Sequence, residues 1–198
     1  RERGISVALL DTETKNSSQC SVSVDDVRGG EIAIEHLASL GHKEIAWVTG
    51  PETIPQVADR TAGVMRAAKI AKVEISTVRV PLMNSAQGTD AVKKILALKK
   101  MPSAIFCGND LLAFGVMRGL LDAGKKIPED VSLIGYDDIA FGNSAAVPLS
   151  SISQPAYQLG VTAAELLISE CEESEDHAHQ QIKFQPQLVV RASTTKKK

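Results

Sequence analysis

The sequence predicts an α/β fold in which a doubly wound parallel sheet carries helices on both faces. Short apolar runs rich in branched residues alternate with amphipathic segments of helical length. Each run ends abruptly in glycine and polar side chains, as 104–107 does at Gly108. The stretch 102–143 contains two such runs with a helix between them, which is a βαβ unit and requires parallel pairing with a right-handed crossover.

The expected strands are apolar runs that are too short to form helices. They cover 5–10, 45–48, 77–80, 104–107 and 131–134. The segment 149–154, which lies between two prolines, is either a connecting strand or a linker. After an acidic loop at 172–176, apolar residues on both sides of Pro186 predict a closing hairpin or a pair of strands.

The expected helices show apolar residues at helical spacing. They cover 27–40, 56–71, 87–98, 111–123 and 157–171. The first is followed by Gly41 and the fourth by Gly124, and glycine commonly occupies the position just after a helix. Strands and helices therefore alternate along most of the chain, which favours one large domain or two smaller lobes.

Composition excludes several classes of protein. The 198 residues include 22 Lys and Arg against 24 Asp and Glu, which gives a net charge of −2. A protein that binds DNA by itself usually has an excess of basic residues, so this chain is not expected to bind DNA directly. The basic stretch 196–198 is expected to be a solubilising tail. No apolar run reaches membrane-spanning length and no signal peptide pattern is seen, so a cytoplasmic location is expected. Three widely spaced cysteines indicate free thiols in a reducing compartment.

Catalytic motifs are absent from the sequence. It contains no GxGxxG, GxxxxGK[ST], GxSxG or HExxH, so neither an enzyme nor a bound cofactor is expected. His36 is interpreted as a structural helix residue and His42 as a capping residue at a helix end. His177 and His179 form an HxH pair beside the acidic loop. A metal site needs preorganised ligands, which such a loop does not offer, so no metal site is expected.

Polar side chains follow two of the expected strands. Ligands of open parallel sheets bind beyond the carboxyl ends of the strands, which is where Asn109, Asp110, Asp137 and Asp138 would lie. The sequence leaves an alternative for each pair. Asn109 or Asp110 can cap the helix that follows, and the two later aspartates can form a turn and a helix cap.

Arg60 is a second kind of candidate, because it lies near the start of a helix that follows a loop containing glycine and prolines. Its planar guanidinium could hold vicinal hydroxyls or a carboxylate through two parallel hydrogen bonds. The alternative is a salt bridge to Asp59 or to another carboxylate of the chain.

These residues occur in an ordered series of motifs that resembles the effector-binding core of the LacI/GalR family of bacterial transcription regulators. The motifs are VDD at 24–26, GG at 29–30, HL at 36–37, LGHKEIA at 40–46, TGP at 49–51, RTAG at 60–63, PSAIFCGND at 102–110, AFG at 113–115, IPEDVSLIGYDD at 127–138, PL at 148–149 and QP at 154–155. Their order and spacing extend over nearly the whole chain.

The resemblance implies a periplasmic-binding-protein-like fold, in which two lobes joined by three crossovers enclose the effector. It implies a nearly complete C-terminal lobe for effector binding and dimerisation at 25–154 and 180–195, with 196–198 as a tail. A remnant of the N-terminal lobe is expected at 1–24 and 155–172. The helix-turn-helix headpiece, the hinge helix and most of the N-terminal lobe are not found in the sequence.

The resemblance also assigns five residues to the effector site: Arg60, Met83, Asn109, Asp137 and Gln154. Arg60 would bind hydroxyl or carboxylate groups, and Gln154 would approach from the third crossover. Met83 stands where many relatives place an aromatic ring that stacks on the ligand. Asp110 and Asp138 would position these groups or cap a helix. Alanine at Arg60 or Asp137 is expected to abolish the effector response and to leave the fold intact.

The function implied is the sensing of a small polar metabolite, a sugar or a nucleoside, by a homodimer that contacts operator DNA only through the missing headpiece. Phe114, Met117 and Leu121 could contribute to the dimer contact or pack on their own sheet. A periplasmic sugar-binding protein of a transport system is the alternative with the same fold. A Rossmann-type dehydrogenase would need a glycine-rich phosphate loop, which no strand end provides.

Overall fold

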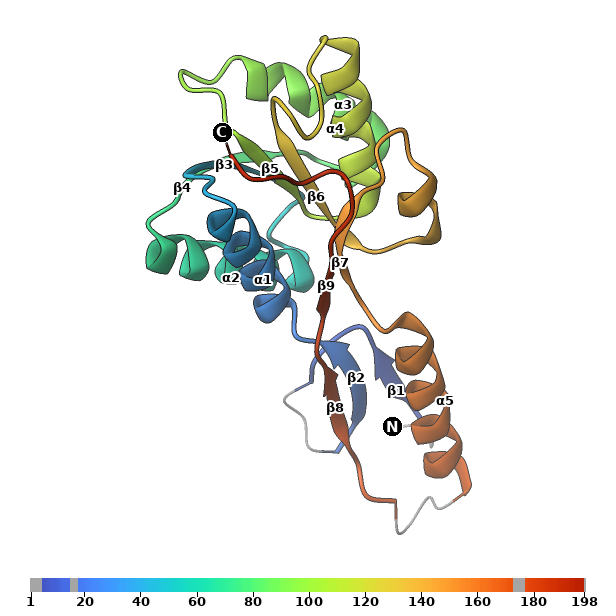
Figure 1. Ribbon diagram of the computed structural model, residues 1–198. Helices are drawn as coiled ribbons and strands as arrows, with labels where there is room; N and C mark the ends of the chain where they lie inside the picture. The colour runs from blue at the N-terminus through green and yellow to red at the C-terminus, as the bar shows by residue number, and fades with distance from the viewer. Residues whose placement is uncertain (1–4, 15–17, 173–176, 198) are drawn as a thin grey trace. The chain divides into compact units, whose positions relative to one another are not determined.

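The computed structural model describes residues 5–14, 18–172 and 177–197, and the chain divides into two compact units (Figure 1). The larger unit contains Asp26–Ser153 and Gln187–Lys198. The smaller unit contains Arg1–Asp25 and Gln154–Pro186. The chain thus enters the larger unit twice, and each unit has its own sheet.

The larger unit is built on a six-stranded sheet. Its strands are β3 (Glu44–Thr49), β4 (Glu74–Arg79), β5 (Ala104–Cys107), β6 (Ser132–Asp137), β7 (Ser150–Ser153) and β9 (Gln187–Val189). The order is β4-β3-β5-β6-β7-β9, and all neighbours are parallel except the antiparallel pair β7 and β9. This confirms the doubly wound parallel sheet that the alternating pattern predicts.

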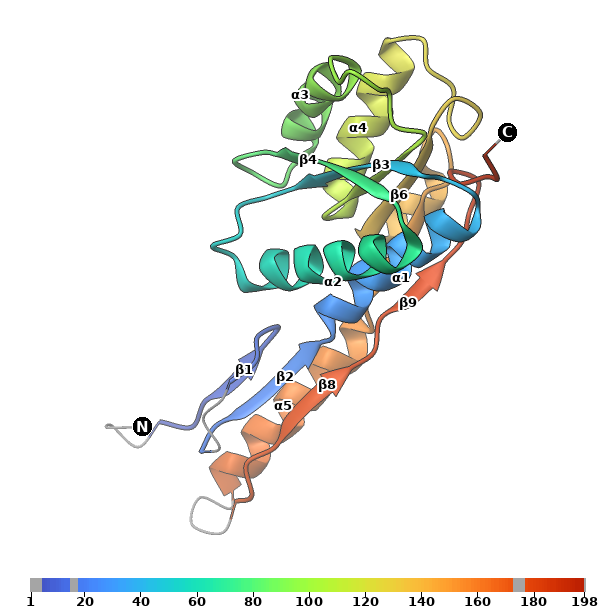
Figure 2. The same ribbon diagram turned by 90° about the vertical axis from the view of Figure 1, so that its left-hand side faces the viewer.

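Helices cover both faces of this sheet (Figure 2): α1 (Asp26–Ser39) and α2 (Pro55–Ala71) on one, and α3 (Ser85–Leu96) and α4 (Asp110–Asp122) on the other. Successive residues of a strand point to opposite faces of the sheet and pack into a separate hydrophobic core on each face. Trp47 and Phe106 pack toward α1 and α2, with ring centroids 4.5 Å apart, while Val48 and Cys107 pack toward α3 and α4. Cys107 is therefore a core residue as predicted, and burial raises the pKa of its thiol.

Glycines let the paired helices approach each other closely. A Cβ atom on Gly63 of α2 would lie 2.0 Å from the carbonyl oxygen of Val27 in α1. In the other pair, a Cβ atom on Gly115 of α4 would lie 1.9 Å from the carbonyl oxygen of Ser85 in α3. Real Cβ atoms do not approach other atoms so closely, so only glycine fits at these two positions. Close helix packing therefore explains the glycine of the RTAG motif and the glycine of the AFG motif.

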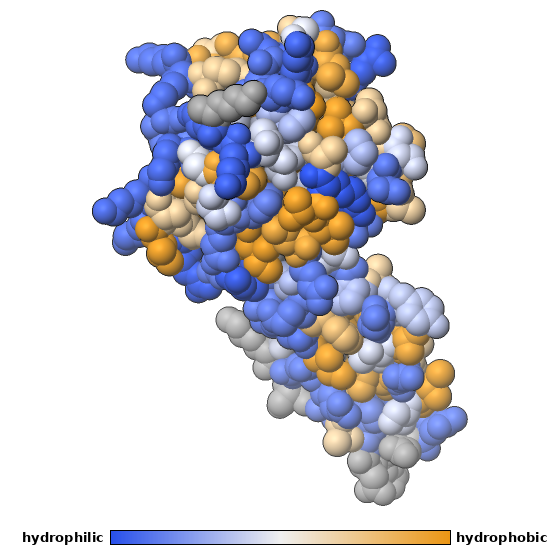
Figure 3. Space-filling model, viewed as in Figure 1, coloured by the Kyte–Doolittle hydropathy of each residue, from blue (hydrophilic) through white to orange (hydrophobic). Residues whose placement is uncertain are grey.

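The smaller unit has a parallel three-stranded sheet of order β1-β2-β8, and α5 (Ala156–Glu172) packs against it. Its strands are β1 (Ala8–Leu10), β2 (Cys20–Val24) and β8 (Gln181–Phe184). Its core comprises Cys20, Val22, Val24, Leu159, Ala163 and Leu166. Other apolar residues of α5, such as Ile168, are exposed, and Figure 3 shows hydrophobic side chains among hydrophilic ones over this helix.

The structure adds one strand that was not predicted and decides between the two alternatives left open around Pro186. The segment 20–24 was not predicted as a strand, although its sequence CSVSV alternates apolar and polar residues with the two-residue period of a strand. The residues around Pro186 form two strands and no hairpin, because β8 pairs with β2 whereas β9 pairs with β7. The segment 149–154 contains the strand β7.

The boundaries of the units also differ from the expected lobe boundaries. Residues 180–186 fall in the smaller unit, because β8 is hydrogen-bonded to β2, and only the chain from Gln187 onward returns to the larger unit. Gln154 is likewise the first residue of the second segment of the smaller unit. Lys197 lies on the larger unit, where its N–H donates to the carbonyl of Leu40 at 2.9 Å, so it is not a free tail.

His42 is buried and has a role other than capping. One ring nitrogen lies 3.0 Å from the hydroxyl of Ser103, and the other lies 3.0 Å from the carbonyl oxygen of Thr195. Burial lowers the pKa of His42. This histidine therefore fastens the C-terminal segment to the larger unit. None of the helices in the described ranges is long and apolar enough to cross a membrane.

Candidate functional site

The carboxyl edge of the larger sheet contains a topological switch point between β3 and β5. From β3 the chain passes through α2 to β4 on one side, and it then returns through α3 to β5 on the other side. Ligands of open α/β sheets bind at such points. Gly50 follows β3 and Gly108 follows β5, and the Gly108 N–H donates to the Val48 carbonyl at 2.8 Å.

Arg60 lies in α2 beneath this edge and is buried in a polar network. Its Nε donates to Asp26 Oδ1 at 2.7 Å, and its Nη1 donates to the Gly108 carbonyl at 2.8 Å. The guanidinium lies 3.7 Å from the centre of the Tyr136 ring, and the Tyr136 hydroxyl donates to the same Asp26 oxygen at 2.8 Å. One arginine thus connects α1, α2, β5 and β6.

The groups of this network favour the protonated forms of both Arg60 and Tyr136. Burial by itself would lower the pKa of Arg60, but the nearby Asp26 carboxylate, the Tyr136 hydroxyl and the Asp137 charge together outweigh this, and the net pKa is raised. Burial raises the pKa of Tyr136, so its hydroxyl remains a proton donor. The alternative interpretation of Arg60 as a salt-bridge partner describes the structure, with Asp26 rather than Asp59 as the partner. An alanine at Arg60 would leave a buried carboxylate without its cation, contrary to the expectation that the fold stays intact.

Asn109 caps α4 at the same edge. Its side-chain oxygen accepts from the N–H of Leu112 at 2.9 Å, and its side-chain nitrogen donates to the carbonyl of Met83 at 3.1 Å. This confirms that one of the two polar residues after β5 is a helix cap. The half-buried Met83 side chain packs against the glycines after β3 and β5, since a Cβ atom on Gly50 would lie 2.7 Å from the Met83 sulfur.

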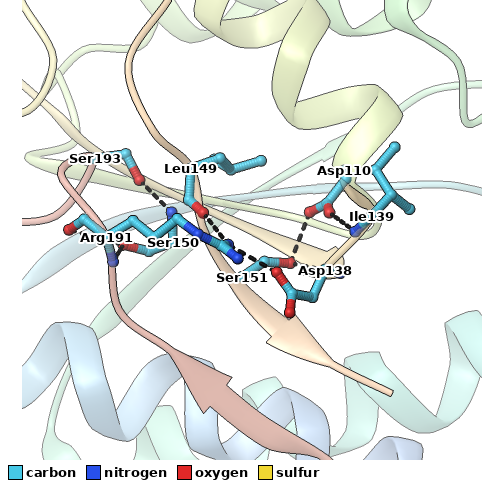
Figure 4. A network of polar contacts seen from close by, with 8 residues as sticks. All are labelled: Asp110, Asp138, Ile139, Leu149, Ser150, Ser151, Arg191 and Ser193. Carbon is cyan, nitrogen blue, oxygen red and sulfur yellow. Dashed lines mark hydrogen bonds and ion pairs between the residues drawn. The ribbon is translucent and has the colours of Figure 1, made fainter. Parts of the chain in front are cut away.

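The end of β6 has an unusual backbone. Asp137 has φ 104° and Asp138 has φ 53°, which are both positive although neither residue is glycine. Such conformations cost about 1–3 kcal/mol each and persist only where surrounding contacts hold them. Figure 4 shows these contacts: the Asp138 N–H donates to the Ser151 hydroxyl at 3.1 Å, and the Asp138 carboxylate pairs with Arg191 at 2.7 Å.

Asp110 is the buried centre of this network. It accepts hydrogen bonds from the hydroxyl of Ser151 at 2.7 Å and from the N–H of Ile139 at 2.9 Å (Figure 4). Burial raises the pKa of Asp110 to about 6. A Cβ atom on Gly135 would lie 2.1 Å from its carboxylate, which explains the glycine in β6. Asp110 and Asp138 thus hold the loop after β6 in place.

Asp137 is the last residue of β6 and is half-buried. Its negative charge contributes to the raised pKa of Arg60, so the two groups interact electrostatically. The structure therefore brings four of the five predicted residues to the carboxyl edge of one sheet: Arg60, Met83, Asn109 and Asp137. The fifth, Gln154, immediately follows β7 and belongs to the smaller unit.

Three residues at this edge were not singled out from the sequence. Asp26 and Tyr136 are the partners of Arg60, although both lie within the motifs quoted above. Thr49 ends β3 at the switch point, and its buried hydroxyl has no hydrogen-bond partner within the part of the chain that the structure describes. The polar TGP sequence after an apolar strand was the available signal for Thr49.

Comparisons with known proteins agree with this fold. A family model described as a periplasmic binding protein-like domain matches residues 34–194. The HTH-type transcriptional repressor PurR of Vibrio parahaemolyticus is 33% identical over 199 aligned positions, which cover 100% of this chain and 59% of that protein. PurR of Haemophilus influenzae strain Rd is 33% identical, with 83% of this chain and 50% of that protein covered. The chain thus spans little more than half the length of these relatives.

Solved structures show the same likeness. A LacI family transcriptional regulator from Enterococcus faecium with bound ribose superposes with a TM-score of 0.91 at 33% identity, covering 100% of this chain and 73% of that one. A LacI family regulator from Enterococcus faecalis V583, also with bound ribose, gives a TM-score of 0.91 at 32% identity, covering 100% of this chain and 71% of that one.

Proposed function

Because the chain belongs to the periplasmic-binding-protein-like family of LacI-type effector-binding domains, we propose that it binds a small polar metabolite, a sugar or a nucleoside, on behalf of a transcription regulator. The observation that carries the proposal is the group of polar side chains at the switch point of the larger sheet. Asp137 is the main element of that group, because its φ of 104° is strained and the residue after it, Asp138, is held by a network of buried contacts.

The chemistry of this edge suits a ligand with several hydroxyl groups. The Asp137 carboxylate accepts hydrogen bonds, the Asn109 amide both donates and accepts, and the Thr49 hydroxyl does the same. Met83 adds a polarisable apolar surface for the less polar face of a sugar or base. The two Enterococcus regulators that superpose on this chain hold ribose, which is a ligand of this class.

In the whole protein this binding would regulate attachment to operator DNA in the cytoplasm. A ligand shifts an equilibrium only when it binds one conformation better than another, and coupling of about 1–3 kcal/mol is typical of such systems. By linkage, operator DNA bound through a headpiece would change the affinity for the metabolite by the same factor.

The regulator would act as a homodimer, with exposed apolar side chains near α4 as part of the contact. Phe141 is 61% exposed and forms an edge-to-face pair with Phe114 at 5.2 Å, and Leu121 is also exposed. Met117 is buried in the core of its own unit, so it is left out of the proposed contact.

Unfolding in the presence of candidate ligands tests the proposal. The fluorescence of Trp47, the only tryptophan, reports on the larger unit. A ligand at about 100 times its Kd should add about 2.7 kcal/mol to the free energy of unfolding. Sugars and nucleosides are screened against this chain and against a longer one with a complete N-terminal lobe.

The proposal predicts stabilisation by a member of this panel that is lost in Asp137→Ala and kept in Asp90→Ala, which changes an exposed aspartate of α3. A response of the longer chain alone would support the same site and show that it needs the other lobe. No response from either chain across the panel, or a response that survives Asp137→Ala, would overturn the proposal.

A further inference from the structure

Four metal-binding side chains meet in the smaller unit. They are Cys20 at the start of β2, Glu170 in the last turn of α5, and His177 and His179 before β8. One ligand atom from each residue lies within 4.8 Å of all the others. From the sequence, the HxH pair beside an acidic loop predicts no metal site, because such a loop offers no preorganised ligands. The structure places Cys20 and Glu170 beside the two histidines.

We propose that these four residues bind one zinc ion. The Cys20 sulfur lies 3.1 Å from His177 Nε2 and 3.6 Å from His179 Nδ1. In a tetrahedral site with Zn–S of about 2.3 Å and Zn–N of about 2.0–2.1 Å, a sulfur and a nitrogen ligand are about 3.5 Å apart. The observed separations therefore match neighbouring ligands around one central ion.

A second observation concerns the far side of the His177 ring. Its Nδ1 lies 3.0 Å from the hydroxyl of Ser169, while its Nε2 faces Cys20. Metal-ligating histidines almost always donate their other ring N–H to a polar partner, which fixes the tautomer. Ser169 can accept this hydrogen bond and thus leave the lone pair of Nε2 for the metal.

The donor set and the burial both favour zinc. Cys20 is fully buried and Glu170 is only 6% exposed. A thiolate, a carboxylate and two neutral imidazoles balance the charge of Zn²⁺, which avoids the cost of burying a net charge. Sulfur and nitrogen donors suit zinc, whereas calcium and magnesium prefer oxygen ligands. On binding, the thiol proton of Cys20 is released to solvent.

The site is structural rather than catalytic, because four protein ligands fill a tetrahedral shell and leave no open position. It lies at the amino ends of β2 and β8, since Cys20 begins β2 and the two histidines precede β8. The metal would link the residues just before β8 and the end of α5 to β2, the central strand of a small sheet. Small units with few core residues commonly depend on such a link.

Cobalt titration of the whole chain tests this inference. An untagged chain, treated with a chelator and then dialysed, is titrated with Co²⁺, which substitutes for zinc and absorbs visible light. We expect one equivalent per chain, the visible bands of tetrahedral cobalt, a thiolate-to-cobalt charge-transfer band, and displacement by Zn²⁺. Zinc should also raise the midpoint of thermal unfolding of the smaller unit, followed by circular dichroism.

Variants separate this site from adventitious binding. Cys20→Ser should abolish the charge-transfer band. His179→Ala changes a side chain that is less buried than Cys20, so the fold should tolerate it, and it should weaken cobalt binding at least tenfold. Cys171→Ser is the matched control, because this exposed cysteine adjoins Glu170 and should leave both stoichiometry and spectrum unchanged. Absence of stoichiometric binding by the folded chain would overturn the inference. A charge-transfer band that survives Cys20→Ser, or binding unaffected by His179→Ala, would also overturn it.

Discussion

Replacement of Arg60 by methionine is the most informative test of the larger unit. Arg60→Met keeps an apolar stem and removes the guanidinium, so the Asp26 carboxylate, which is 5% exposed, loses its cation. The Gly108 carbonyl loses its donor as well. Removing one partner of a buried ion pair costs about 3–5 kcal/mol, a large part of the stability of about 5–15 kcal/mol of a typical domain.

Urea unfolding followed through Trp47 fluorescence measures this loss. Trp47 is fully buried in the same unit, so its emission reports on the affected core. If the free energy of unfolding falls by about 2 kcal/mol per molar urea, the urea midpoint should fall by about 1.5–2.5 M. Arg118→Met is the matched control, because Arg118 is in the same unit and both it and its partner Asp122 are largely exposed. Exposed pairs contribute about 0–1 kcal/mol, so its midpoint should hardly move.

A double variant distinguishes a charge effect from simple loss of volume. In Asp26→Asn/Arg60→Met no buried carboxylate remains, so the combined loss of stability should be smaller than the sum of the two single losses. A loss of less than about 1 kcal/mol in Arg60→Met, or a loss no larger than that of Arg118→Met, would show that the buried pair does not stabilise the unit. Strict additivity of the two single changes would also show that Arg60 and Asp26 do not act as a pair.

Three further predictions concern the carboxyl edge. Burial raises the pKa of Asp110 to about 6, so the folded state holds this proton more tightly than the unfolded state does. The free energy of unfolding that protonated Asp110 contributes should therefore fall by about 3 kcal/mol as the pH rises from about 4 to about 7. It is measured as the difference in unfolding free energy between the native chain and Asp110→Asn. A flat difference, like that expected for the exposed control Asp90→Asn, would contradict this. Asn109→Ala removes the cap of α4 and should cost about 1 kcal/mol in urea unfolding, with no change taken as evidence against the cap. Asp137→Gly relieves a positive φ, so the free energy of unfolding should be unchanged or higher by up to about 1 kcal/mol while ligand-induced stabilisation disappears, and retained ligand stabilisation would contradict the site.

Local patterns in the sequence predict the local structure well. The apolar run 104–107 coincides with β5, and the polar residue after it is the cap of α4, because both features depend on neighbouring residues alone. The strand β2 was missed because its alternating CSVSV pattern is short and includes two serines. Its two-residue period was nevertheless present and could have been used.

Features that depend on distant residues were harder to predict. Arg60 and Asp26 are both in recognised motifs, but nothing in the spacing of 34 residues identifies them as partners. The partners of β8 and β9 lie in different units, which no local pattern around Pro186 reveals. The four-residue cluster in the smaller unit likewise joins positions from both ends of the chain, so only the HxH pair was visible in the sequence.

Amide chemical shifts locate a bound metabolite, which we propose to lie at the carboxyl edge of the larger sheet. The chain, labelled with ¹⁵N, is titrated with ribose and with the strongest ligand from the panel. We predict that the amide signals that move most belong to Gly50, Asn109 and Asp137, and that Asp137→Ala removes these shifts. Saturable shifts confined to other regions, such as the smaller unit, would show that the metabolite does not bind at this edge.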